Sequence, residues 1–423
     1  MSTDTDPALS PPLPSLSATV LGPGENDDEV SVYDRVFWFT YLANGLTTVA
    51  NAMLVRYSDF VNLLGGEEKQ LGLIVGFGML GSIAMRLVQG VGIDRYGAAR
   101  IWQGSMVVYA ASLFAHLLLS TAHGPGIFVV RAIMQTSLAG VFGSSITFVS
   151  LRVSPPRVAE IIGALGTSGF IGIMLGPQIS DWICRGPEIG IRQVQTLFVT
   201  AAAMASLAAL ATCLATTGHR APVARRQPNL RRMVRRYTPA GVALVAAAMG
   251  AGFAIPMTFL RPFATELGFG RIGLYFTVYA GTAFVTRLAT RRVFERHGNR
   301  PWIIVGMTLL TVSFLLYVPV TRTWHLLAPG ATAGVAHALL FPSVMSAGTT
   351  AFPRRFRGVA TSLMLAMFDF GTFLGAPVVG AFLEHTKQLT RAAYPATFSA
   401  TSVVMLVTTV LFCLWPSAGK RSR

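Results

Sequence analysis

Long apolar segments recur along the whole chain, with short polar connections between them. A helix needs about 20 apolar residues to cross a hydrocarbon layer of ~30 Å, and a window of about 19 residues finds roughly twelve such segments. Lipid cannot hydrogen-bond open backbone groups, so such segments fold as helices. The pattern therefore predicts an all-α membrane protein with twelve transmembrane helices. The predicted spans are Val36 to Leu64, Gln70 to Gly92, Ile101 to Ser120, Ile127 to Leu151, Val158 to Ile183, Val194 to Ala215, Ala240 to Leu267, Gly273 to Val293, Trp302 to Val320, Trp324 to Thr349, Gly358 to Leu383 and Pro395 to Leu414.

The composition excludes most soluble classes of protein. Hydrophobic residues make up 52% of the 423 residues, charged residues only 12%, and the mean hydropathy is +0.55. The net charge of +16 suggests nucleic acid, but the arginines lie between the spans, so a lipid bilayer is the expected partner and nucleic acid is not. Cys184, Cys213 and Cys413 have neither disulfide nor metal spacing, so no metal ion or cofactor is expected.

Lys and Arg concentrate in every second connection, which places both termini in the cytoplasm by the positive-inside rule. No Asn-x-Ser/Thr sequon occurs, and a bacterial inner (plasma) membrane is the expected location. The expected organisation is a disordered cytoplasmic tail at 1–34, a six-helix bundle at 35–216, a basic cytoplasmic linker at 217–238, a second six-helix bundle at 239–416 and a basic tail at 417–423.

A motif that follows the second predicted span reappears in the second half. Its first copy runs from Gly90 to Arg100 and places an acid, two arginines and a tight turn after an apolar helix. The correspondences are Arg86-Leu87 with Arg287-Leu288, Asp94-Arg95-Tyr96-Gly97 with Glu295-Arg296-His297-Gly298, Val55-Arg56 with Leu260-Arg261, and Gly172-x-x-x-Gly176-Pro177 with Gly371-x-x-x-Gly375-Ala376-Pro377. Because each half has six spans, the two copies have the same orientation and form parallel repeats.

These motifs resemble those of the major facilitator superfamily over nearly the whole chain past the first 34 residues. Gly90-x-x-x-Asp94-Arg95-x-Gly97-x-x-Arg100 is similar to the family's signature between spans two and three, with Ala99 in place of a basic residue. In span five, the pattern of Gly163, Gly172, Gly176 and Pro177 is similar to the helix-packing motif of antiporters, with Ser180 and Asp181 where that pattern prefers glycine. Arg131, Gln135 and Gly140 partly resemble the arginine motif of span four. The resemblance implies the drug/metabolite:proton antiporter branch.

The resemblance also implies a gate on the cytoplasmic side. Asp94 is expected to meet the positive start of span eleven, near Arg357, when the inside is closed, and Glu295 to meet the start of span five near Arg157. The alternative is that these residues only fix a short loop and extend to water. The gate set is Gly90, Asp94, Arg95, Gly97, Arg100, Glu295, Arg296, Gly298 and Arg357.

Asp369 is the acid expected nearest the membrane midplane. It lies about 11 residues into span eleven, which at 1.5 Å per residue is a depth of about 16 Å. A carboxyl group there is a candidate for taking up a proton in one conformation and releasing it in another. The alternative is a carboxylate paired with a neighbouring arginine.

The resemblance implies a central cavity lined by spans one, four, seven and ten. Polar residues on span one recur every three or four positions, and span seven is mainly apolar, which favours a moderately hydrophobic substrate. The alternative for the polar side chains is hydrogen bonding between helices. The expected cavity residues are Tyr41, Asn44, Thr48, Asn51, Arg131, Gln135, Phe253 and His337.

Together these features predict a secondary active transporter, not an enzyme, so no catalytic residues are expected. No nucleotide-binding loop of the GxxxxGK[S/T] type is present, which leaves an ion gradient as the energy source. Proton-coupled export of a small amphipathic or drug-like compound by a monomer is the leading hypothesis. Proton-coupled uptake of a metabolite and a non-transporting membrane receptor stay open as alternatives.

Overall fold

The structure is a computed structural model that describes residues 33–153, 157–186, 189–218, 230–290, 298–353 and 356–416. All regular structure within these ranges is helical, which confirms the all-α prediction. The first half contains α1 (Arg35–Met53), η1 (Leu54–Arg56), α2 (Tyr57–Leu63), α3 (Glu68–Tyr96), α4 (Ala98–Ala115), η2 (His116–Leu118), α5 (Pro125–Ser150), α6 (Val158–Ile183) and α7 (Ile191–Thr216). The second half contains α9 (Ala240–Glu266), α10 (Gly273–Thr290), α12 (Asn299–Leu315), η4 (Thr323–Leu326), α13 (Leu327–Thr350), α14 (Arg357–Leu389) and α15 (Ala393–Leu414).

Within the described ranges, nine helices are long and apolar enough to cross a membrane. The helices α1, α10 and α12 occupy the remaining predicted spans; α12 is a shorter apolar helix. The first predicted span is not one continuous helix, because the 3-10 turn η1 separates α1 from α2.

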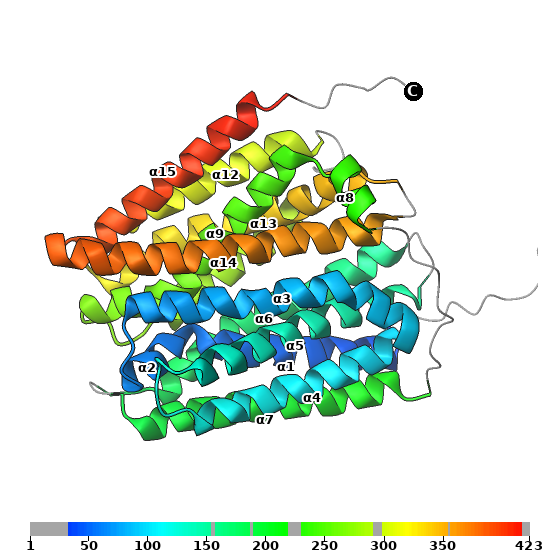
Figure 1. Cartoon of the computed structure of the whole chain (residues 1–423), viewed down its shortest axis with the longest axis horizontal. Coiled ribbons are helices and arrows are strands. Elements are labelled where there is room, and N and C mark those ends of the chain that lie inside the picture. The colour runs from blue at the N-terminus through cyan, green and yellow to red at the C-terminus, as the bar shows by residue number, and fades with distance from the viewer. Residues whose placement is uncertain are drawn as a thin grey trace, which may run out of the picture.

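The two halves lie side by side along their length. In Figure 1, α1 to α7 fill one side of the molecule and α9 to α15 the other, with α3 and α14 running next to each other where the halves meet. A second contact between the halves pairs α6 with α10. The linker between the halves contributes the short helix α8 (Leu230–Tyr237), whose Tyr237 ring packs against Phe352.

The repeated loop motif gives the same backbone turn in both halves. Gly97 has a φ of 86° before α4, and Gly298 has a φ of 69° before α12. A side chain disfavours this left-handed region, so glycine is suited to both positions. We call this end of the bundle the Gly97 end and the opposite end, where α1 passes into α2, the Arg56 end.

Small residues let the helices of the two halves approach closely. A β-carbon at Gly72 of α3 would overlap the carbonyl oxygen of Ala376 in α14, and one at Gly76 would overlap the ring of Pro377. Small residues at helix contacts are the usual means of close packing in lipid. The α3–α14 contact is therefore tight toward the Arg56 end.

Several sequence-based expectations fall outside the described residues. These are the tail up to residue 32, the linker residues 219–229, the C-terminal tail 417–423, and the gate residues Glu295 and Arg296.

Candidate functional site

A cavity of about 400 Å³ lies between the two halves. Helices α1, α3, α5 and α6 line it from one half, and α9, α10, α13 and α14 from the other. Its volume is within the usual range for small-molecule sites. The cavity residues expected from the sequence that line it are Thr48, Asn51, Arg131, Gln135, Phe253 and His337.

Tyr41 and Asn44, also expected in the cavity, are not among its lining residues. The Tyr41 hydroxyl lies 2.9 Å from the Thr167 hydroxyl, and the Asn44 amide donates a 3.0 Å hydrogen bond to Ser168, both in α6. In this conformation, the polar side chains of α1 therefore serve two purposes. Tyr41 and Asn44 contact α6, whereas Thr48 and Asn51 line the cavity.

The close contact between α1 and α6 involves two of the glycines expected for helix packing. A β-carbon at Gly172 would lie 2.5 Å from the β-carbon of Thr48, and one at Gly176 would lie 2.7 Å from the carbonyl oxygen of Val49. Pro177 lies inside the same helix, whereas a β-carbon at Gly163 would meet no atom within 4 Å. Gly172 and Gly176 thus hold one wall of the cavity in place.

The second half supplies an aromatic wall. The Phe253 and His337 rings lie 4.8 Å apart between centroids, and a His337 ring nitrogen is hydrogen-bonded to the Tyr279 hydroxyl. Met257 and Phe276 extend the apolar surface beside them. This wall suits an aromatic or aliphatic group on a ligand.

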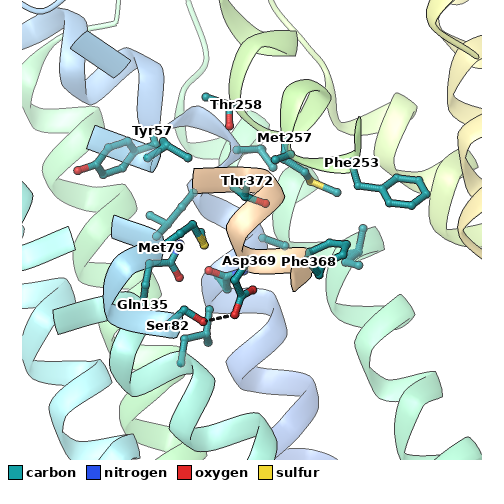
Figure 2. A pocket seen from close by; sticks show the side chains of 18 of the residues that line it. Tyr57, Met79, Ser82, Gln135, Phe253, Met257, Thr258, Phe368, Asp369 and Thr372 are labelled. Atoms are coloured by element: carbon teal, nitrogen blue, oxygen red, sulfur yellow. Dashed lines mark hydrogen bonds between the residues drawn. The ribbon is translucent and has the colours of Figure 1, made fainter. Parts of the chain in front are cut away.

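Asp369 lies on the cavity wall and joins the two halves. Its carboxylate accepts a hydrogen bond from the Ser82 hydroxyl at 2.6 Å and one from the Arg86 Nε at 2.6 Å, both from α3. Figure 2 shows the carboxylate beside Ser82 and, on the other side of this turn of α14, the Phe253 ring. Asp369 is only 6% exposed, so the ion pair is largely removed from water. The pair with Arg86 is the arrangement that the alternative interpretation of Asp369 expected, and the role of Asp369 as a proton site stays a prediction.

Arg287 is the counterpart of Arg86 in the other half, and its surroundings differ. Its guanidinium carbon lies 5.8 Å from the centroid of the Phe170 ring, and it forms no ion pair with any described residue. Phe170 stands two residues before Gly172, as Asp369 stands two residues before Gly371. The repeat therefore places an aromatic ring where the other half has the carboxylate.

Arg131 on α5 faces the same cavity without a carboxylate partner among the described residues. Its guanidinium carbon lies 4.3 Å from the centroid of the Tyr57 ring, and its Nη1 lies 3.9 Å from the Met134 sulfur. No described residue accepts a hydrogen bond from its Nε, although the side chain is buried. Arg131 therefore brings an uncompensated positive charge to the cavity.

A buried network of four charged residues joins the two halves at the Arg56 end. Arg56 donates to Asp181 from Nε at 2.9 Å and from Nη2 at 2.7 Å, and to Asp59 from Nη1 at 2.9 Å. Arg261 of the second half donates to the same Asp59 from Nε at 3.1 Å. None of the four is more than 9% exposed, and their formal charges sum to zero.

Asp181 also caps a helix of the opposite half. Its second carboxylate oxygen accepts hydrogen bonds from the backbone N–H groups of Ile272 at 2.8 Å and Gly273 at 2.6 Å, at the start of α10. A carboxylate at a helix N-terminus is favoured by the helix dipole. Sequence reasoning missed this network, although the repeated Arg56 and Arg261 and the departure at Asp181 from the glycine pattern were its signals.

The α3–α14 contact carries further ion pairs at the Arg56 end. The Lys387 amine lies 2.5 Å from the Glu68 carboxylate, and the Lys69 amine lies 3.3 Å from Glu384. Ion pairs thus join the two halves at two places near the Arg56 end. One is the α3–α14 contact, and the other is the network around Arg56.

The expected gate residues at the Gly97 end are arranged differently. Gly90, Arg100 and Arg357 are exposed, and the Arg95 guanidinium lies over the neighbouring Tyr96 ring. Arg357 forms no ion pair with any described residue, and a β-carbon at Gly358 would meet no atom within 4 Å. Asp94 is half-buried. Among the described residues, Arg357 thus takes no part in an ion-pair network like the one at the Arg56 end.

Comparison with solved structures supports the fold. The nucleoside transporter NupG matches with a TM-score of 0.73 at 15% identity, covering 89% of this chain and 98% of that one. A D-xylose-proton symporter matches with a TM-score of 0.74 at 14% identity, covering 90% and 97%.

Comparison with curated proteins finds distant relatives. The staphylopine export protein of Staphylococcus aureus is 20% identical over 341 residues, which are 75% of this chain and 81% of that protein. A putative tartrate transporter of Agrobacterium vitis is 29% identical over 153 residues, which are 36% of this chain and 34% of that protein.

The family model described as Major Facilitator Superfamily matches residues 36–271 and 240–423, which together span nearly the whole chain. The match agrees with the all-helical fold and with the loop motif that recurs in the two halves. The chain therefore belongs to the Major Facilitator Superfamily and is a membrane transporter, not an enzyme.

Proposed function

We propose that this protein exports a small amphipathic compound by alternating access and couples export to protons. The observation that carries the proposal is the Arg86–Asp369 ion pair, which joins α3 to α14 across the wall of the cavity between the halves. The apolar surface of Phe253 and Met257 supports an amphipathic substrate, and the export activity named for the Staphylococcus aureus relative supports the direction.

Asp369 is the proposed proton site. A proton on its carboxyl group removes the negative charge that holds Arg86, so the contact between α3 and α14 weakens at the depth of the cavity. Substrate in the cavity and a proton on Asp369 thus act on the same contact between the halves. This is how a transporter of two rocking halves can couple two ligands.

The two ends of the bundle are the proposed gates. The charged network of Arg56, Asp59, Asp181 and Arg261, which joins the halves at one end, is the proposed gate there. When the Gly97 end is closed, Asp94 pairs with the start of α14 and the Glu295 region pairs with the start of α6. The distribution of Lys and Arg supports the Gly97 end as cytoplasmic, with both termini on that side of a bacterial inner membrane.

Proton-coupled uptake is the second candidate. Asp181 occupies a position where the antiporter pattern prefers glycine, and here it serves the network at the Arg56 end. The two candidates differ in the direction of proton movement: export by exchange acidifies the compartment that loses substrate, whereas symport alkalinises it.

The test uses purified protein in liposomes and three probes with one aromatic body: 1-naphthylacetate, 1-naphthylacetamide and 1-naphthylmethylamine. We expect a pH gradient to drive at least one probe, and Asp369→Asn to reduce this driven flux at least about tenfold. Exchange of labelled for unlabelled probe should continue in Asp369→Asn, because it needs no net proton movement. Glu67→Gln, which alters an exposed carboxylate, is the control.

Two results would contradict the proposal. Driven flux at the wild-type rate in Asp369→Asn removes Asp369 as the proton site. A wild-type protein that binds one of the probes and moves none of them supports a receptor instead.

A further inference from the structure

Buried charge in the described part of the chain is balanced with one exception. The charged side chains that are at most 9% exposed are Arg56, Asp59, Arg131, Asp181, Arg261 and Asp369. Five of these six have an oppositely charged group within 4 Å. Only Arg131 has none.

An isolated guanidinium in a transmembrane helix is costly, and arginine is not neutralised by losing a proton. The Tyr57 ring provides part of the compensation, since a cation lies favourably over an aromatic face. A ring face accepts no in-plane hydrogen bonds, however, and Nε has no acceptor among the described residues. Nε is enclosed by the protein and Nη1 has only a 3.9 Å contact with the Met134 sulfur, so the Nη groups of this cavity-lining side chain are the ones available to an acceptor with negative charge.

The surroundings of Arg131 suit one end of an amphipathic molecule. Gln135 follows one helical turn along α5, and Asn51 faces the cavity from α1. The second half provides the apolar surface of Phe253 and Phe276. Polar and apolar contacts thus come from different halves.

The other charges on the cavity wall limit the charge of the ligand. Arg86 is engaged by Asp369, so this pair adds no net charge while Asp369 is ionised. Arg131 alone then gives the lining a net charge of one positive unit. A ligand with one negative charge balances the charge of Arg131. A second negative charge on the ligand would find no unpaired cation among the lining residues.

We propose that Arg131 binds the carboxylate of a monoanionic amphipathic substrate, with the apolar body of that substrate against Phe253 and Phe276. The planar fork of a guanidinium matches the two oxygens of a carboxylate. This proposal rests on the proposed transport function and specifies its substrate class.

The test compares binding of the same three naphthyl probes, which share the naphthylmethyl body and carry an anionic, a neutral or a cationic polar group, by the rise in melting temperature of the detergent-solubilised protein. Wild-type protein should bind 1-naphthylacetate at least about tenfold more tightly than the neutral amide or the cationic amine. Arg131→Gln should remove this preference, and Arg131→Lys should keep part of it. Arg322→Gln, which alters an exposed arginine, should behave as wild type.

Equal binding of the three probes by wild-type protein, or an intact preference in Arg131→Gln, overturns the carboxylate site. If Arg131→Gln does not fold, the probe series on wild type and Arg131→Lys decides the question. Binding without flux contradicts transport but keeps the site. Flux of the amide or amine as fast as that of the acetate contradicts only the site.

Discussion

The two most extensive helix contacts between the halves place their buried charge at different depths. In the α3–α14 contact, the Arg86–Asp369 pair lies at the cavity, and glycine packing lies toward the Arg56 end. In the α6–α10 contact, Arg287 lies over Phe170, and the charged group is Asp181, at the Arg56 end. Arg86 and Arg287 correspond in the two repeats, but Arg86 contacts a carboxylate and Arg287 contacts an aromatic ring.

The proposed coupling and gating would assign one task to each of these two contacts. Under the proposed coupling at Asp369, the Arg86 contact responds to protons, whereas the Phe170 ring beside Arg287 has no exchangeable proton. Asp181 instead joins the start of α10 to Arg56 at the Arg56 end of the bundle. This asymmetry would suit a transporter in which the α3–α14 contact binds the coupling proton and the α6–α10 contact controls access to the cavity from the Arg56 end.

We expect the largest effect when the Arg86–Asp369 ion pair is broken. Arg86→Gln leaves the Asp369 carboxylate buried without its cation, and removing one partner of a buried pair costs about 3–5 kcal/mol. The free energy of unfolding in detergent at neutral pH should fall by that amount. The double variant Arg86→Gln with Asp369→Asn should recover most of the loss, since no charge is then left alone. Equal stability of the single and double variants would contradict the pairing.

A smaller effect is expected at the Arg56 end. Asp181→Asn weakens the hold of α6 on Arg56 and on the start of α10. Cys184 follows directly after α6 and is 3% exposed, whereas Cys213 and Cys413 are exposed. In a Cys213→Ser, Cys413→Ser background, the labelling rate of Cys184 by a thiol reagent should rise about tenfold, which corresponds to about 1.4 kcal/mol.

The control for this measurement is Glu67→Gln in the same background, because Glu67 is exposed near the same end without a role in the network. A labelling rate unchanged by Asp181→Asn would show that the network does not hold this end closed.

The smallest effect concerns the aromatic contact. Arg287→Lys keeps the charge but loses the planar group over Phe170, and cation–π contacts contribute about 0.5–1 kcal/mol at accessible sites. The free energy of unfolding should fall by about this amount, and the pH dependence of driven flux should stay as in wild type. A shift in that pH dependence would place proton coupling at both arginines and remove the asymmetry.

The fold was predictable because the spans depend on local hydropathy, and the turns at Gly97 and Gly298 depend on one residue each. The 3-10 turn before Arg56 was not predictable, because it accompanies contacts with residues far away in the sequence, such as Asp181. The depth of Asp369 followed from its place along a helix. Its pairing with Arg86 required knowledge of which helices meet.

The cavity was predictable only in part, for a similar reason. Helical periodicity identified the polar stripe on α1, but not which neighbour covers each part of it. Close approach of α6 at Gly172 turns Asn44 toward Ser168, and leaves Asn51 on the cavity. The pairings expected of the gate at the Gly97 end depend on the conformation as well as on the sequence, so they stay predictions.

The balance of charge also decides where a membrane voltage can act. The four charges at the Arg56 end sum to zero, so opening and closing that end moves little net charge through the electric field. Arg131 has no such counter-charge, and a full unit charge crossing the membrane changes energy by about 2.3 kcal/mol per 100 mV. If Arg131 binds a monoanion as proposed, voltage should act on the reorientation of the substrate-free protein, and the bound monoanion should cancel the charge that Arg131 contributes to that movement while Asp369 stays ionised.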